Sequence, residues 1–351
     1  MCRPPKWLVG SCPRSRRVWR NDWRNSPARA SPLGLDRAHE RRRVIDNALN
    51  PYRRAPDATA RRGCARLALL SETADQRRYT RSRVVNIPSR LRRELKACLG
   101  PLDESLIVFD ALGQRRGLML DVGAHHGNSL TPFAAAGWHV HAFEPDSANR
   151  AYLVRHHGDS PHVVIVPCAV SDEPGKMTLY TSAESTGVSS LVPFTSGHQP
   201  AEEVEVITLA DYLGQLQAPR VDFLKIDVEG YEQHVLDGYD WAIKPRAIVL
   251  EFEDRKTVPL GYNWRDLADR LHGLGYMVMV SEWYPPVRYG VEHRWRRFAT
   301  YPCDLADSHA TGNLIAFQDV SLMRLRAALT ISRLRLTVRG PLRLARDRLR
   351  Q

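Results

Sequence analysis

The amino-acid sequence predicts an α/β fold, in which an open, mostly parallel, Rossmann-like sheet carries helices on both faces. The first observation is that apolar runs of strand length alternate with helix-like patterns from Leu118 onward, which is typical of such sheets. The second is the run Leu-Met-Leu-Asp-Val-Gly-Ala-His-His-Gly-Asn at 118–128, where an apolar strand reaches Asp121 and enters a glycine turn. The third is Glu144, which directly follows the next apolar run and lies 21 positions after Gly123.

The hydrophobic periodicity also gives the order of the elements. A helix is expected at Pro88–Leu99, ahead of the sheet. The expected strands are 118–123, 138–143, 162–169, 221–227, Ala247–Glu253, 276–281 and Asn313–Phe317. The expected helices between them are 128–136, 146–156, 209–217, 231–237 and 264–273.

Two segments interrupt this alternation. An insertion after Gly175 has β character at Lys176–Tyr180 and Val204–Thr208, and we expect a mobile loop at Ser185–Gln199 between them. The segment 282–311 is rich in aromatic residues and arginine, and we expect a long loop there. Such a loop is either a lid or substrate wall, or an ordinary packed loop whose aromatic residues fill the edge of the core.

The turn after the first strand has features of a nucleotide-cofactor loop. Its glycines, Gly123 and Gly127, allow the backbone to approach a ligand, and a helix expected to open at Asn128 would offer free N–H groups. The spacing Gly-x-x-x-Gly differs from the Gly-x-Gly-x-x-Gly of nicotinamide proteins. Because Asp121 precedes the first glycine, the loop suits an adenosyl cofactor with an ammonium group better than one with a pyrophosphate.

Glu144 lies near the offset of about 20 residues at which an acid reaches a nucleoside ribose in doubly wound folds. A carboxylate at this place can accept hydrogen bonds from both ribose hydroxyls. The alternative is a solvated acid at the end of a strand, or a cap for the helix that begins near Asp146.

The chain resembles the FkbM-type family of S-adenosylmethionine-dependent methyltransferases. The motifs that carry the resemblance occur in the family's order across roughly 101–320. They are Asp121–Asn128, Phe143–Pro145, Ala169–Asp172, Ser189–Leu191, Val206–Leu209, Val249–Glu251 and the specific run Lys-Ile-Asp-Val-Glu-Gly at 225–230. The resemblance implies the class I methyltransferase fold, with seven strands of which the last is reversed.

The resemblance also implies S-adenosyl-L-methionine as the cofactor, held at the carboxyl ends of the strands, where open α/β sheets bind their ligands. Asp121 and its loop would serve the amino acid end, Glu144 the ribose, and the Ala169–Asp172 turn the adenine. The residues expected to bind the cofactor are Asp121, Gly123, Ala124, His125, Gly127, Asn128, Glu144, Ala169 and Asp172.

The family's substrate class implies methyl transfer to a hydroxyl group, on a sugar of a glycan, a glycolipid or a glycosylated metabolite. A hydroxyl is a poor nucleophile while protonated, so a base or a metal ion is useful. We expect Asp227 as base or metal ligand, with Glu229 assisting it or orienting the acceptor. In the alternative, Asp227 touches only the cofactor and Glu229 caps the next helix. Whether a divalent metal takes part stays open. Lys225 is expected to form an ion pair with Asp227 or Glu251.

Charge divides the chain into three parts. Residues 1–100 carry 25 Lys and Arg against 8 Asp and Glu, residues 101–319 carry 17 against 30, and residues 320–351 carry 9 against 1. From the charge we predict a basic, disordered extension at 1–85 and a basic amphipathic tail at 321–351, and the resemblance implies a methyltransferase domain at 86–320 between them. Leu322, Leu325, Leu329 and Ile331 fit one helix face of this tail, which either packs on the domain or rests on an anionic membrane.

Composition limits the other functions and partners. Nucleic acid is not expected as a partner, because arginine clusters such as Arg41–Arg43 lack interleaved stacking aromatics. The Asn/Asp-Pro-Pro-aromatic motif of amino-group methyltransferases is missing after 221–227, which disfavours methylation of nucleic acid or protein. Six scattered cysteines favour reduced thiols and a cytoplasmic location, with contact to the inner membrane face as an option. A scaffold that keeps the fold without turnover is the alternative from another class.

Overall fold

The computed structural model describes residues 102–113, 116–286, 289, 294–332 and 334. The extension 1–85 and the expected helix at Pro88–Leu99 lie outside the described residues, as does most of the basic tail. Among the described residues, no helix is both long and apolar enough to span a membrane.

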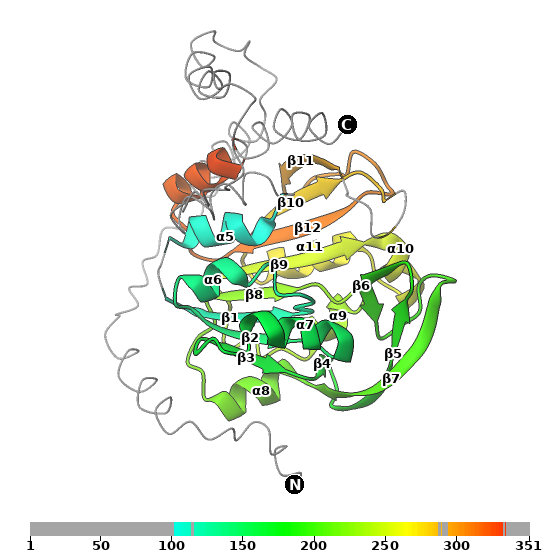
Figure 1. The fold of residues 1–351 in the computed structure, drawn as a ribbon. Coiled ribbons are helices and arrows are strands. Elements are labelled where there is room, and N and C mark those ends of the chain that lie inside the picture. Colours follow the sequence, from blue (N-terminus) through cyan, green and yellow to red (C-terminus); the bar gives the residue numbers. More distant parts are fainter. Residues whose placement is uncertain (1–101, 114–115, 287–288, 290–293, 333, 335–351) are drawn as a thin grey trace, which may run out of the picture. The chain divides into compact units, whose positions relative to one another are not determined.

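The described chain is built on a sheet of eight strands in the order β11-β10-β12-β9-β8-β1-β2-β3 (Figure 1). Strands β3, β2, β1, β8 and β9 are parallel, and β12 lies antiparallel between β9 and β10. The strands are β1 (Leu118–Val122), β2 (His139–Phe143), β3 (Val163–Val166), β8 (Phe223–Ile226), β9 (Ala247–Glu253), β10 (Met277–Trp283), β11 (Trp295–Thr300) and β12 (Thr311–Phe317). Seven of these strands, in the order β3-β2-β1-β8-β9-β12-β10, match the predicted class I arrangement. The strand that is last in the sequence, β12, is the reversed one.

Helices cover both faces of this sheet. One face carries α5 (Glu104–Leu112), α6 (Thr131–Ala135) and α7 (Ser147–His157), and the other carries α8 (Leu209–Leu216), α9 (Glu232–Asp237) and α11 (Trp264–Gly273) (Figure 1). The short α10 (Asp254–Thr257) and the 3-10 helix η4 (Val258–Leu260) follow β9 directly.

The packing agrees with the strand alternation. Val140 and Ala142 of β2 belong to the core beneath α6, whereas Phe143 points to the opposite face and meets Tyr212 of α8. The predicted α/β fold with helices on both faces is confirmed.

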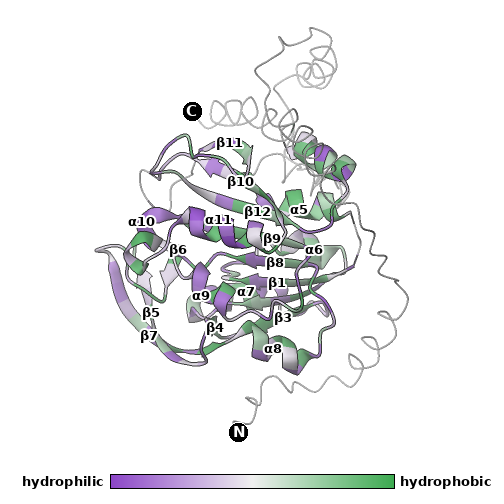
Figure 2. Cartoon of the chain, turned by 180° about the vertical axis from the view of Figure 1, so that it is seen from behind, coloured by the Kyte–Doolittle hydropathy of each residue, from purple (hydrophilic) through white to green (hydrophobic). Residues whose placement is uncertain are grey.

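A smaller sheet follows β3 and has the order β4-β7-β5-β6. Its strands are β4 (Ala169–Val170), β5 (Gly175–Ser182), β6 (Ser185–Ser190) and β7 (His198–Ile207). Figure 2 shows hydrophilic residues along β5 and β7, and much of β7 is exposed. The expected strand at 162–169 is therefore divided between the two sheets.

Three expectations about local structure are corrected. The expected mobile loop at Ser185–Gln199 contains β6, which pairs with β5, and the start of β7. The expected loop at 282–311 contains β11, which adds an eighth strand beside β10. The helix expected at 128–136 begins at Thr131, because residues 125–130 form turns, so Asn128 is not at a helix N-terminus.

Two aromatic residues of the 282–311 segment, Trp283 and Tyr301, pack inward. Trp283 and Tyr301 are 9% and 6% exposed; Trp283 donates to the buried acid Glu104, and Tyr301 donates to Asp269, an exposed acid of α11. These two contacts favour the packed-loop alternative for their part of the segment.

The start of the basic tail forms a helix over residues 322–332. Leu325 and Leu329 are buried in the core cluster and Leu322 packs against it, as the predicted face requires. Ile331, in contrast, is 39% exposed and does not share that face. The described start of the tail is therefore a packing helix.

Candidate active site

A pocket lies at the carboxyl ends of β1, β2, β4 and β8, where the sheet order reverses. Gly123, Glu144 and Asp227 all line this pocket. Of the other predicted site residues, His125, Ala169 and Glu229 also line it. Asp121, Ala124, Gly127, Asn128 and Asp172 do not line it.

Gly123 joins the β1 loop to the turn after β8. Its φ is +78°, and an added Cβ would lie 1.8 Å from the carbonyl oxygen of Asp227. Gly123 and Ala124 both donate backbone N–H groups to the Phe143 carbonyl at the end of β2, at 3.1 and 3.0 Å. Only glycine fits here without displacing the backbone that carries Asp227.

Glu144 is held at the end of β2 by backbone donors. Its carboxylate accepts from the His125 N–H at 2.7 Å and from the Asp146 N–H at 3.0 Å. Burial raises the pKa of Glu144 to about 7, against the lowering effect of these two donors. The alternative of a solvated acid is excluded because Glu144 is 4% exposed, and it is Asp146 that caps α7.

Asp121 stands behind the pocket wall. It is fully buried, and its neighbour across the sheet is Lys225 of β8. The Lys225 ammonium lies 3.5 Å from Asp121 and 3.0 Å from Asp227. Burial raises the pKa of Asp121 to about 6, although Lys225 opposes the rise. The predicted ion pair of Lys225 with Asp227 is present, and Asp121 supports it.

Asp227 and Glu229 experience different electrostatic surroundings. Burial alone would raise the pKa of Asp227, but the Lys225 ammonium lowers it below its ordinary value. Burial raises the pKa of Glu229 to about 7, even though the Lys256 ammonium opposes the rise. At neutral pH, Asp227 is therefore ionised, whereas Glu229 can exchange a proton.

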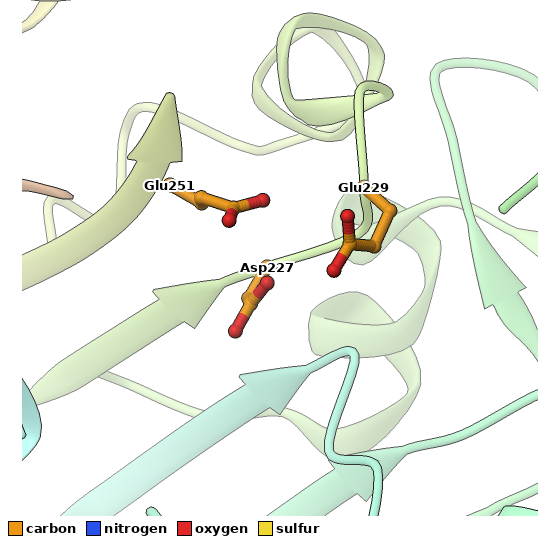
Figure 3. A group of neighbouring side chains, drawn as sticks. All are labelled: Asp227, Glu229 and Glu251. Carbon is orange, nitrogen blue, oxygen red and sulfur yellow. The ribbon is translucent and has the colours of Figure 1, made fainter. Parts of the chain in front are cut away.

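Glu251 from the end of β9 completes a group of three acids. Figure 3 shows the carboxylates of Asp227, Glu229 and Glu251 turned toward a common space, and each offers an oxygen within 4.8 Å of the others. Lys256 pairs with Glu229, Glu251 and Glu253. Neither the position of Lys256 nor its burial was predicted from the sequence.

The three acids are oxygen donors of the type that hard cations prefer. However, each already pairs with an ammonium group of the protein: Asp227 with Lys225, and Glu229 and Glu251 with Lys256. Because two lysines supply positive charge to all three carboxylates, we assign no metal to them.

Strand β6 forms a wall of the pocket beside the glycine loop, with Thr186 hydrogen-bonded to His125 at 3.1 Å, and this wall was not predicted. Thr186, Gly187, Ser189 and Ser190 line the pocket. The Asn149 amide donates to the Thr186 carbonyl at 3.0 Å, and the Ser189 hydroxyl donates to Asp146 at 2.8 Å. The smaller sheet is thus tied to the start of α7. The Ser189–Leu191 motif was the only sequence signal for this wall.

Asp172 lies at the end of the Ala169–Asp172 turn and is exposed. Its carboxylate accepts from the Ser171 hydroxyl at 2.6 Å, and this bond holds the pKa of Asp172 below its ordinary value. Its role as an adenine contact stays a prediction, as do the roles of Ala124, Gly127 and Asn128.

Comparisons with known proteins identify the family. The family model of the methyltransferase FkbM domain matches residues 121–278. The 31-O-demethyl-FK506 methyltransferase FkbM of Streptomyces tacrolimicus is 31% identical over 203 residues, which cover 47% of this chain and 74% of that protein. The chain belongs to the FkbM methyltransferase family. As an FkbM methyltransferase, it is an enzyme of the S-adenosylmethionine-dependent class.

Other proteins similar to this FkbM methyltransferase match over fewer residues or at lower identity. Methyltransferase 1 of Beauveria bassiana is 32% identical over 124 residues, and the chain spans 47% of its length. The solved FkbM methyltransferase of Methylobacillus flagellatus is 17% identical with a TM-score of 0.36, over 58% of this chain and 44% of that one. A Bacillus cereus O-methyltransferase in complex with SAH is 11% identical with a TM-score of 0.34, over 67% of this chain and 93% of that one. The fold assignment rests on the sheet order above.

Proposed function

We propose that this FkbM methyltransferase transfers a methyl group from S-adenosylmethionine to a hydroxyl group on a sugar of a glycan, glycolipid or glycosylated metabolite. The observation that carries the proposal is that Gly123, Glu144, Asp227 and Glu229 line a single pocket. Oxygen as the acceptor atom is supported by the Streptomyces relative, whose name places its methyl group on an oxygen. The sugar is inferred from the family resemblance.

The donor set of the pocket fits an adenosyl cofactor. The Glu144 carboxylate can accept from ribose hydroxyls with the lone pairs that the two backbone donors leave free. Ala169 and Val170 from β4 offer a small apolar surface to an adenine ring. The loop at Gly123 and His125 would face the amino acid end, with Asp121 acting through Lys225. Once bound, the cofactor supplies a methyl group on a cationic sulfur.

The chain itself must align the acceptor and remove its proton. Methyl transfer is an in-line displacement, so a fixed acceptor position contributes much of the rate. The hydroxyls of Thr186 and Ser189 and the carboxylates of Asp227 and Glu229 line the pocket, which suits an acceptor with several hydroxyl groups. Asp227 and Glu229 are the two groups that could orient the attacking hydroxyl or take its proton.

Calorimetric titration with S-adenosylhomocysteine tests cofactor binding. The full chain should bind it, and above pH 7, where Glu144 is ionised, Glu144→Gln should weaken binding at least about tenfold, because it removes a charged acceptor from the pocket. Glu203→Gln is the matched control, since Glu203 is an exposed acid of β7 that pairs with Lys176. Folded protein that releases no heat, or equal affinities for the two variants, would contradict the proposed site.

The acceptor class requires a separate experiment. Transfer of labelled methyl groups to a polysaccharide extract should exceed transfer to bulk RNA or to cell protein. Label that appears mainly in RNA or protein would overturn the sugar assignment while leaving the cofactor site intact.

The proposal includes a cytoplasmic location, with peripheral membrane contact through the basic tail as an option. Its support is indirect: the two described cysteines, Cys168 and Cys303, are free thiols, and residues 320–351 carry 9 basic residues against 1 acid. Membrane contact would involve the part of the tail beyond the packing helix at 322–332. Binding of the full chain, but not of a chain ending at residue 334, to vesicles rich in phosphatidylserine would support it.

A further inference from the structure

Lys256 is a buried cation behind the pocket wall that carries Asp227 and Glu229. Its side chain is 2% exposed, and its ammonium contacts Glu251 at 3.1 Å, Glu253 at 3.0 Å and Glu229. The rings of Phe194 and Tyr289 lie 5.3 and 5.7 Å from the ammonium, within the range of cation–π attraction. A lysine this deeply buried is held in one position by its carboxylate partners.

Glu229 is fixed at both ends. Its backbone has φ +60°, a left-handed conformation that is uncommon outside glycine, and the Ser190 hydroxyl of β6 donates to its carbonyl at 2.9 Å. The side-chain carboxylate pairs with Lys256. Ser190 therefore fixes where the turn lies, and Lys256 fixes where the carboxylate points.

We propose that Lys256 is a positioning residue: it holds the Glu229 carboxylate at the pocket wall, where Glu229 takes up the proton of the acceptor hydroxyl. This inference rests on the proposed function. As the acceptor oxygen forms its bond to the methyl carbon, its O–H bond breaks and the proton passes to an oxygen of Glu229. The carbon–sulfur bond breaks at the same time, and its electron pair stays on sulfur.

Asp227 is less suited to take this proton. Its carboxylate accepts from the Lys225 ammonium at 3.0 Å, and Lys225 is itself anchored by the buried Asp121. Lys256, in contrast, is shared among three acids, so that Glu229 receives only part of its charge. The pKa of Asp227 is lowered, whereas that of Glu229 is raised to about 7, the range that suits a base at neutral pH.

Glu229 titrates among several other ionisable groups, and any pH effect includes them. The elements packed around it contribute the following groups: Asp227 and Lys225 from β8 and its turn, Glu251 and Glu253 from β9, Lys256 and Arg255 from α10, Glu232 from α9, and Tyr289. Glu251 is the most informative neighbour. Burial raises its pKa and Lys256 opposes the rise, as they do for Glu229.

The test follows the proton on Glu229 directly, by carbon-13 NMR of side-chain glutamate carboxyls in the full chain. The resonance is assigned by its loss in Glu229→Gln, and its titration midpoint is then measured in each variant. Lys256→Met should raise the midpoint by at least about one pH unit, because the carboxylate loses its counter-charge. Lys256→Arg should restore the midpoint to within about half a unit. Lys244→Met, on an exposed lysine that donates to Leu274, is the matched control and should leave the midpoint unchanged.

A second variant covers the case in which Lys256→Met does not fold. Glu251→Gln removes a negative neighbour and frees Lys256 for Glu229, so the midpoint should fall. Transfer of labelled methyl groups to the polysaccharide extract provides a rate measurement. In Lys256→Met, the rise of this rate with pH should move to higher pH by the same amount as the midpoint.

The outcomes separate this inference from the proposed function. Lys256 does not line the pocket, so Lys256→Met should bind S-adenosylhomocysteine within about twofold of the parent chain. An unchanged Glu229 midpoint in folded Lys256→Met, or in Glu251→Gln, overturns the positioning role even if the cofactor binds. Absence of cofactor binding in the parent chain instead overturns the proposed function, whatever the midpoints are.

Discussion

At the scale of single residues, Gly123 sets the distance between the cofactor loop and the turn that carries Asp227. Gly123→Ala should lower the free energy of unfolding by about 3 kcal/mol or more, because a Cβ would overlap the Asp227 carbonyl at 1.8 Å and φ is +78°. Cofactor affinity should fall as well, since both pocket walls must move. Urea unfolding and titration with S-adenosylhomocysteine measure the two effects.

Gly137 provides the control for the backbone contribution. It has φ +86°, but open space surrounds the position of an added Cβ. Gly137→Ala should therefore lower the free energy of unfolding by only about 1–2 kcal/mol and leave cofactor affinity intact. Equal losses in the two variants would show that the close approach at Gly123 is unimportant.

Individual residues also show the limit of sequence-based prediction at the site. Glu144, Asp227 and Glu229 were predicted because each ends a recognisable apolar strand, and the structure brings them to one pocket. Lys256 could not be predicted, because it lies in the four-residue helix α10 and nothing in the local sequence shows that its ammonium is buried. Its partners come from two separate strand ends, so its role depends on how β8 and β9 pair.

At the scale of elements, a buried acid joins α5 to β10. Glu104 is 5% exposed and accepts from Ser281 at 2.6 Å and from Trp283 at 2.8 Å. Burial raises its pKa from 4.5 to about 7, against the effect of these donors. The folded state therefore binds a proton that the unfolded state has lost in this range. The resulting stability is present in full below pH 4.5 and is lost as the pH rises through 7.

Glu104→Gln should remove this pH dependence, because glutamine does not titrate and can still accept from both donors. The free energy of unfolding of the parent chain, relative to the variant, should decrease by up to about 3 kcal/mol between pH 4 and pH 8. Urea unfolding at several pH values measures this difference. Asp121 and Glu144 also have raised pKa values, but their contributions are the same in both chains and cancel in the difference. A constant difference across this range would mean that the pKa of Glu104 is the same in the folded and unfolded states.

Elements were predicted well where local signals mark their ends. The bounds of β9 and α11 match the expected ones, and α11 begins at a capping box formed by Asn263 and Asp266. Strand β6, in contrast, reads Ser-Thr-Gly-Val-Ser-Ser and has little apolar character. Strand β11 pairs only with β10 in the described sheet. Both strands depend on long-range partners, which the periodicity of a short segment does not show.

At the scale of the whole molecule, the uneven charge predicts that the basic N-terminal part is not needed for cofactor binding or catalysis. A chain that lacks residues 1–85 should bind S-adenosylhomocysteine within about twofold of the full chain, because every residue that lines the pocket lies beyond residue 121. Calorimetry of both chains provides the measurement. A large loss of affinity would indicate instead that the extension completes the site, and loss of a partner alone would favour the scaffold alternative.

The two edge strands of the main sheet, as the described residues form it, differ in chemistry. At one side, β11 carries Arg296 and Arg297 on a strand of six residues, and Arg297 pairs with Glu282 at 2.6 Å. At the other side, β3 is apolar but only four residues long, with Val164 45% exposed. Charge and brevity are two means by which natural proteins discourage edge-to-edge aggregation. An incoming strand would therefore meet, at β11, charged side chains already held in ion pairs, which it would have to desolvate, and at β3 a ladder only four residues long.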